Sequence, residues 1–289
     1  MKKNKKCAVL IVLFLLLALC LIISRFTNTI KLEGKILFNT RNDDRFSTGI
    51  TIYDCLNDEF IELPITGGRA AFWGEDKILF DNASIYEYDL NTSQIKMVYQ
   101  DENINYFTPK DKDSFSFSKD NSIFLYNIKS GETILLVENV GGNSGAHSWS
   151  NDGNILYYSH DSYPPKIKSY DIHTNEIKDV TEGSEPTVCG TNIAFVKKGV
   201  LFVKDLKSGK EYRYSGNSYN YCFSPDGNII VLQDAMSIHT AIKLIIKEGI
   251  KDAPVLLDSV AVWDYKNNSK KILIDAINSS PELICDWRY

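Results

Sequence analysis

Short apolar runs alternate with polar, turn-forming segments through most of the chain after residue 33. The clearest runs are rich in Ile, Val, Tyr and Phe, end in Asp or Asn, and are followed by residues such as Asn, Ser and Gly. Six segments share this pattern: 50–55, 85–90, 123–128, 167–172, 201–206 and 260–265. Runs of this kind, bounded by turn residues, predict β-strands that are joined by tight turns.

These copies recur along the chain at similar intervals. Their Asp or Asn residues are Asp54, Asp89, Asn127, Asp171, Asp205 and Asp264, which gives spacings of 35, 38, 44, 34 and 59 residues. A second hairpin precedes each copy, most clearly at the S-x-D-G turns of 150–153 and 224–227. A repeat of about 40 residues that contains two hairpins is typical of one blade of a β-propeller.

The sequence therefore predicts an all-β fold, a six-bladed β-propeller of four-stranded antiparallel blades, over residues 34–289. Blades two to six are expected within 69–99, 104–137, 146–180, 186–215 and 220–274. The first repeat, with a strand at 35–38, lacks an innermost strand, and the C-terminal segment 283–289 has the pattern of one. Pairing these two segments closes the ring and removes the exposed sheet edges. A seven-bladed ring that uses the extra residues of the last repeat is the alternative.

An aromatic residue, then S-x-D-G, then an apolar strand resembles the repeat of TolB-type propellers, which are related to WD-repeat proteins. The quoted copies are His147–Tyr158 and Tyr221–Leu232, and the resemblance extends over 34–289. It implies the propeller fold and a binding role in the cell envelope. Six-bladed propellers also include glycosidases and lyases, so the resemblance leaves a second class of function open.

The amino terminus has the pattern of a membrane anchor. Residues 1–6 contain four Lys, and residues 7–24 form an apolar run of nearly the length that a helix needs to cross a bilayer. Because basic flanks stay in the cytoplasm, we expect a cytoplasmic segment 1–6, a signal-anchor helix 7–24, a linker 25–33 and a propeller outside the cell membrane. A cleaved secretory signal and lipidation at Cys20 are the alternatives.

Charge and motifs narrow the possible functions. Residues 1–33 hold six of the 32 basic and one of the 37 acidic residues, so the repeat region carries a net charge of about −10. Such a domain is a poor binder of nucleic acid, since that affinity depends on phosphate neutralisation. The chain contains no G-x-S-x-G, no phosphate-binding glycine loop and no H-E-x-x-H. We therefore predict no cofactor, no metal and no catalytic residue.

Four cysteines lie beyond the predicted anchor, and none has C-x-x-C spacing: Cys55, Cys189, Cys222 and Cys285. Free thiols are the favoured interpretation, and a disulfide among them is the alternative. The four tryptophans recur at strand positions and are expected to pack between blades: Trp73, Trp149, Trp263 and Trp287.

The long connections are all of one topological kind, and they therefore predict one binding face. They join the second strand to the third or one blade to the next, at 41–48, 64–70, 138–146, 159–166 and 235–258, and we expect this face to point away from the bilayer. The candidate binding residues on it are Arg41, Asp43, Asp44, Arg45, Asn143, His160, Asp161, Tyr163 and His239. His147 joins His160, Asp161 and Tyr163 as a possible metal-binding or proton-transfer group, but a strand position explains it better.

The predicted function is that of a membrane-tethered, extracytoplasmic propeller that binds a protein or glycan of the envelope. The lipid bilayer is the expected partner of residues 7–24. The alternative is a propeller-type hydrolase or lyase that acts on carbohydrate or peptide. Such enzymes gather several carboxylates around the reacting bond, and the loops suggest no such set.

Overall fold

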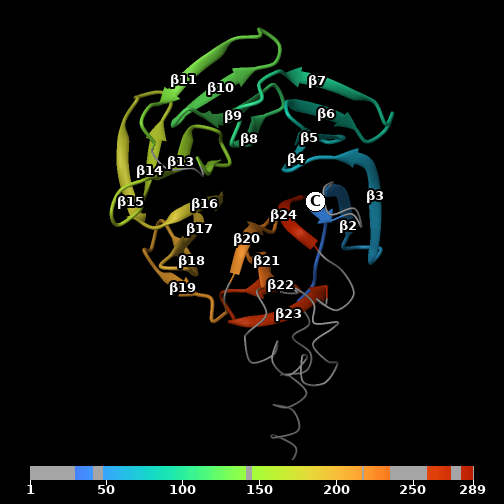
Figure 1. The fold of residues 1–289 in the computed structure, drawn as a ribbon. Helices are drawn as coiled ribbons and strands as arrows, with labels where there is room; N and C mark the ends of the chain where they lie inside the picture. The colour runs from blue at the N-terminus through green and yellow to red at the C-terminus, as the bar shows by residue number, and fades with distance from the viewer. Residues whose placement is uncertain are drawn as a thin grey trace, which may run out of the picture. The chain divides into compact units, whose positions relative to one another are not determined.

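The computed structural model describes residues 30–41, 48–140, 145–216, 218–234, 259–274 and 281–288. Residues Glu33–Tyr289 form one compact unit. Within it, six four-stranded sheets are arranged as the blades of a propeller around a central axis (Figure 1). The predicted six-bladed, all-β architecture is confirmed.

The strands are ordered from the innermost to the outermost in each blade. Blade one contains β24 (Pro281–Arg288), β1 (Lys35–Arg41), β2 (Thr48–Asp54) and β3 (Glu59–Thr66). Blade two contains β4 (Ala70–Trp73), β5 (Lys77–Asp81), β6 (Ile85–Asp89) and β7 (Ile95–Tyr99), and blade three contains β8 (Tyr106–Asp111), β9 (Ser114–Lys119), β10 (Ser122–Asn127) and β11 (Thr133–Val137). Blade four contains β12 (His147–Trp149), β13 (Ile155–His160), β14 (Lys166–Asp171) and β15 (Ile177–Glu182). Blade five contains β16 (Ser184–Cys189), β17 (Asn192–Lys197), β18 (Val200–Asp205) and β19 (Glu211–Arg213), and blade six contains β20 (Ser218–Phe223), β21 (Ile229–Asp234), β22 (Ser259–Asp264) and β23 (Ser269–Ile274).

Blade one closes the ring as the sequence predicted. Strand β24 pairs antiparallel with β1, with Trp287 opposite Ile36 and Arg288 opposite Lys35. Each innermost strand contacts the next, from β4 round to β24 and back to β4. Residues 218–274 supply a single sheet in the described part of the chain, so the long last repeat adds no seventh blade there.

The repeated Asp and Asn residues form the turn between the third and fourth strand of each blade. Asp89 Oδ1 accepts hydrogen bonds from the backbone N–H groups of Asn91 at 2.9 Å and Thr92 at 2.8 Å. Asp54, Asn127, Asp171 and Asp205 accept the same pair of bonds two and three residues further on. The repeated motif is therefore a turn that belongs to the scaffold.

The core lies between the blades, where apolar faces of neighbouring sheets meet. One cluster joins blades five and six around Trp263, whose ring centroid lies 5.1 Å from that of Tyr214. All four tryptophans are buried, which confirms their predicted packing role. Trp73 Nε1 donates to the Asp111 carbonyl in the next blade at 2.7 Å, so these rings also fix the blades to one another.

Two sequence predictions depend on residues at the margins of the described structure. Residues 7–24, the predicted anchor, lie outside it, and among the described residues there is no helix that is long and apolar enough to cross a membrane. Cys55, Cys189 and Cys222 carry thiols. The side chain of Cys285 lies outside the described part.

Candidate functional site: the central cavity

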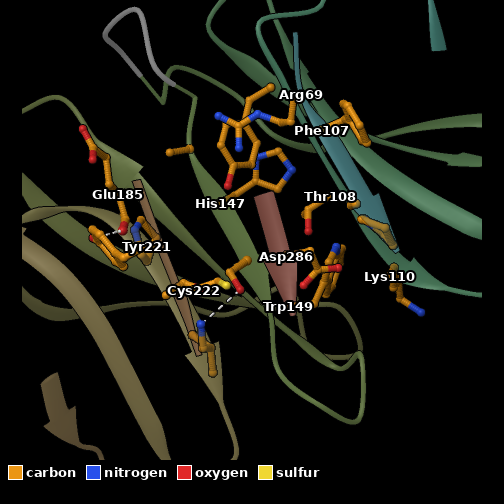
Figure 2. A pocket seen from close by; sticks show the side chains of 18 of the residues that line it. Arg69, Phe107, Thr108, Lys110, His147, Trp149, Glu185, Tyr221, Cys222 and Asp286 are labelled. Atoms are coloured by element: carbon orange, nitrogen blue, oxygen red, sulfur yellow. Dashed lines mark hydrogen bonds between the residues drawn. The ribbon is translucent and has the colours of Figure 1, made fainter. Parts of the chain in front are cut away.

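The six innermost strands surround a cavity of about 600 Å³, which we call the central cavity. Every blade contributes to its lining, including Thr108 on β8, His147 on β12 and Asp286 on β24 (Figure 2). Because each innermost strand is paired along one edge only, the other edge of its backbone faces this space. The cavity is therefore lined by peptide groups as well as by side chains.

The polar residues of the cavity fall into two groups by their place along the strands. Arg69, Tyr106 and Glu185 lie at the beginning of innermost strands, and Lys110 and Asn151 lie at or beyond the strand ends. Connections between blades precede the strand beginnings, so the Arg69 group lies at the end of the cavity that belongs to the predicted long-loop face. The two ends of the cavity therefore carry different side chains: Arg69, Tyr106 and Glu185 at one end, and Lys110 and Asn151 at the other.

The backbone of Arg69 is held by hydrogen bonds, whereas its guanidinium has no hydrogen-bond acceptor among the described residues. Asp81 Oδ1 accepts the Arg69 backbone N–H at 2.6 Å, and the Asp81 N–H donates to the Arg69 carbonyl at 3.0 Å. The guanidinium carbon lies 3.8 Å from the ring centroid of Tyr106, a cation–π distance. Within the described residues the Arg69 guanidinium donates no hydrogen bond and forms no ion pair.

His147 is completely buried and forms two hydrogen bonds. Its Nδ1 lies 2.6 Å from the Gly145 carbonyl and its Nε2 lies 2.8 Å from Ser116 Oγ. Burial lowers the pKa of His147 to about 4, so the ring is neutral at physiological pH and its Nδ1–H donates to Gly145. Ser116 Oγ also accepts the Trp149 indole N–H at 2.8 Å.

This Ser116–His147 contact resembles the nucleophile and base of a hydrolase, but the position of Ser116 excludes that role here. Ser116 lies on the second strand of its blade, β9, and none of its surface is exposed. An attacking hydroxyl must reach its substrate, so the pair is a buried structural hydrogen bond. The prediction that His147 is a strand residue is confirmed.

Two carboxylates line the cavity, and the surrounding protein raises the pKa of each. Asp286 accepts the backbone N–H of Phe72 at 3.0 Å and that of Trp287 at 2.8 Å, and burial raises its pKa to about 6. The bond from Phe72 ties β24 to β4. Glu185 is solvent-accessible but surrounded by protein, which raises its pKa, while the positive charge of Arg69 opposes that shift.

Glu185 is presented to the cavity by an irregularity in β16. Its φ is +56°, and the pairing of β16 with β17 shifts register between Ser184 and Thr187. The Glu185 N–H donates to Ser159 Oγ at 2.8 Å, and its carbonyl accepts the Tyr221 hydroxyl at 2.5 Å. The bulge is thus held from both neighbouring blades, which positions the carboxylate at the Arg69 end.

The side chains of three predicted binding residues are described, and these residues lie apart from the cavity lining. His160 ends β13, and Asp161 and Tyr163 follow in its connection to β14, with Tyr163 fully exposed. Arg41 ends β1, and its side chain lies outside the described part, as do Asp43, Asp44, Arg45, Asn143 and His239. The loop-face site therefore stays a prediction. No group of three metal-binding side chains occurs among the described residues.

The sequence predictions do not include the cavity residues Tyr106, Glu185 and Tyr221, because they assign strands to the scaffold, and Arg69 lies in the predicted connection 64–70 without a motif to mark it. A signal was available, since each of these residues lies within a few positions of the beginning of an innermost strand. Placing those strand beginnings side by side on the predicted ring would have gathered them.

The arrangement defines the chain as a six-bladed β-propeller with a polar central cavity. Solved structures place it with the TolB-like propellers in fold. TolB from Acinetobacter baumannii is 16% identical with a TM-score of 0.51, over 83% of this chain and 68% of that one. A putative TolB from Agrobacterium tumefaciens is 15% identical with a TM-score of 0.58, over 84% and 88%. A chain of a nidogen/laminin complex is 9% identical with a TM-score of 0.62, over 88% and 97%.

At these identities the similarity concerns the fold alone. No protein-family model and no curated protein sequence matches this chain. Its function must therefore be argued from its own cavity and surface.

Proposed function

We propose that this chain is a membrane-tethered, extracytoplasmic propeller that binds a protein of the cell envelope and holds an extended segment of it in the central cavity. The central cavity is the observation that carries this proposal. Its volume of about 600 Å³ lies within the range of ligand-binding sites. The innermost strands present backbone N–H and C=O groups to the cavity, apart from those of Phe72 and Glu185 that side chains already bind. An extended peptide can pair its own N–H and C=O groups with such an edge.

The aromatic lining favours a peptide over a glycan as the occupant. Sugar rings stack on open aromatic faces, but Phe107 and Trp149 are only 2% and 7% exposed. Arg69 covers one face of Tyr106. A glycan ligand is therefore the less favoured expectation, and the experiment below distinguishes it.

Tethering and location rest on the amino-terminal sequence. The four Lys of residues 1–6 and the apolar run 7–24 support a helix that spans the cell membrane with the propeller outside. This chain shares its fold with the two TolB structures. That similarity supports a binding role in the envelope.

A second candidate, a hydrolase or lyase, is favoured by one observation: Glu185 and Asp286 line the same cavity and both have raised pKa values. Both oxygens of Asp286 accept backbone N–H groups, however, which is the geometry of a structural tie. Release of new reducing ends or amines from isolated envelope material by the wild type, but not by Glu185→Gln, would favour the enzyme.

The binding proposal is tested by cross-linking and capture from envelope membranes with the full-length chain. Thr108→Trp places a large ring in the cavity, and Thr133→Trp makes the same change on the exposed outer strand β11. A third variant deletes 236–257, the longest connection of the predicted loop face. We expect a protein partner that Thr108→Trp loses and the Thr133→Trp and deletion variants retain.

Each other outcome counts against part of the proposal. Equal recovery by the wild type and Thr108→Trp would overturn the cavity as the binding site. Loss in the deletion variant alone would move binding to the loop face. A captured ligand that periodate destroys and protease leaves intact would replace the protein partner by a glycan.

A further inference from the structure

The two cationic side chains of the central cavity, Lys110 and Arg69, differ in the partners that they already have. At one end, Lys110 pairs with Asp111 at 3.1 Å and lies 5.6 Å from the ring centroid of Trp149. At the other end, Arg69 is stacked on Tyr106, and its guanidinium has no acceptor among the described residues. Stacking uses the face of a guanidinium and leaves the N–H groups at its edge available. Arg69 thus offers a fork of donors that no described residue accepts from.

The neighbours of Arg69 leave its positive charge without an ion-pair partner in the described structure. His147 lies beside Arg69 (Figure 2) and is neutral, so it neither repels the guanidinium strongly nor shares its role as a cation. Glu185 interacts with Arg69 electrostatically, and the two form no ion pair in the described structure. In a cavity that is partly shielded from water, a charge attracts its ligand more strongly than it would on an open surface.

We propose that Arg69, held against Tyr106, binds a carboxylate group of the protein segment that occupies the central cavity, so that acidic segments are the preferred ligands. This inference rests on the proposed function, which places a protein segment in the cavity. A planar guanidinium and a carboxylate match in a bidentate geometry that a Lys ammonium cannot reproduce. The carboxylate comes either from an Asp or Glu side chain or from a chain terminus.

Glu185 opposes the same ligand and so provides an independent readout. Its carboxylate lies at the Arg69 end of the cavity, and its negative charge weakens the binding of an incoming anion. Removing that charge should therefore strengthen binding, whereas removing the charge of Arg69 should weaken it. A merely structural role for Arg69 would not produce this opposite pair.

The test uses the full-length chain in detergent micelles and a phage-displayed library of random dodecapeptides. We expect the enriched peptides to be rich in Asp and Glu. One enriched peptide is then synthesised with a fluorophore, and its affinity is measured by fluorescence polarisation. Arg69→Gln should weaken binding roughly 10- to 100-fold, which is the effect of losing a charged hydrogen bond. Arg69→Lys should bind with intermediate affinity, and Glu185→Gln should bind more tightly.

Controls separate the carboxylate site from general charge and from folding. Lys207→Gln makes an equal charge change in an exposed outer turn and should bind like the wild type. Replacing Asp and Glu of the peptide by Asn and Gln, or its terminal carboxylate by an amide, identifies which carboxylate is bound. Enriched peptides without acidic bias, or an Arg69→Gln affinity within about twofold of the wild type, would overturn the carboxylate site.

These failures are distinct from a failure of the proposed function. If neutral peptides are enriched and Thr108→Trp abolishes their binding, the cavity holds a protein segment and only the carboxylate site is wrong. If the library yields no binding peptide, both the proposed function and this inference are overturned.

Discussion

The carboxylates of the outer turns and those of the central cavity have opposite acid–base behaviour in one fold. Asp89, Asp171 and Asp205 lie in exposed turns, where backbone N–H groups bind the charged form and lower each pKa. Asp286 is shielded from water, and Glu185 is solvent-accessible but surrounded by protein atoms; the loss of hydration raises the pKa of each. The outer turns stabilise the ionised form of their carboxylates, and this stabilises the folded state. In the cavity, the ionised forms of Asp286 and Glu185 are less stable than they would be in water. Ligand chemistry is expected in the second kind of place.

The largest effect should come from removing the cavity carboxylate that ties the ring together. Asp286→Ala leaves the buried N–H of Phe72 without its acceptor and breaks the side-chain bond between β24 and β4. We expect the free energy of unfolding in urea to fall by about 1–3 kcal/mol. Asp264→Ala, in the outer turn of blade six, is the control and should cost less. An equal loss in both would contradict the comparison.

Asp286→Asn tests the charge of the same group. The pKa of Asp286 is about 6 when folded and near 3.8 when unfolded, so the folded state binds more protons between these values. Its contribution to stability therefore grows as pH falls from about 6 toward 4. The difference in melting temperature between the wild type and Asp286→Asn should change over this window, and a constant difference would contradict the raised pKa.

His147 should show the opposite slope, because burial favours the neutral form of a base as well as of an acid. Its pKa falls from 6.5 to about 4, so the unfolded state binds more protons between these values. The stability that His147 contributes is present above pH 6.5 and is lost as pH falls toward 4. His147→Gln should remove this loss, as measured by thermal unfolding across the window. A pH profile that His147→Gln leaves unchanged would show that the ring is not held neutral.

The smallest effect should come from the outer turns. Asn127 occupies the repeated turn position and accepts the same two backbone bonds, so Asp→Asn changes at 89, 171 and 205 should preserve the turns. Because the folded pKa values of these Asp residues are lowered, the stability they contribute is present above about pH 4 and lost in stronger acid. The triple variant keeps the hydrogen bonds but lacks the charges, so it should be slightly less stable than the wild type near pH 7. Its stability should change less than that of the wild type below pH 4, as measured by circular dichroism. A large loss at pH 7 would contradict this.

The fold followed from the sequence because its signals are local and repeated. Each turn Asp accepts hydrogen bonds from residues no more than three positions further on, so the hairpins can be recognised from short segments of sequence. Ring closure through 283–289 could be predicted by counting the strands of each blade. The cavity was harder to predict. Arg69, Tyr106 and Glu185 are far apart in sequence, and they share one end of the cavity only because the ring places the beginnings of the innermost strands side by side. The bulge at Glu185 occurs without a repeated sequence pattern that would predict it. His147 shows the same limit, since its partner Ser116 is 31 residues away.

Ring closure also sets an order of events during folding. Blades two to six are each built from one continuous stretch, so each can form as soon as its own residues are available. Blade one cannot, because β1 finds its inner partner only in β24, across nearly the whole domain. Contacts at such sequence separation form late, since a long loop must be closed before they are gained. Until then β1 keeps an open edge, so the strand that completes the architecture also ends the period in which the chain is most exposed to mispairing.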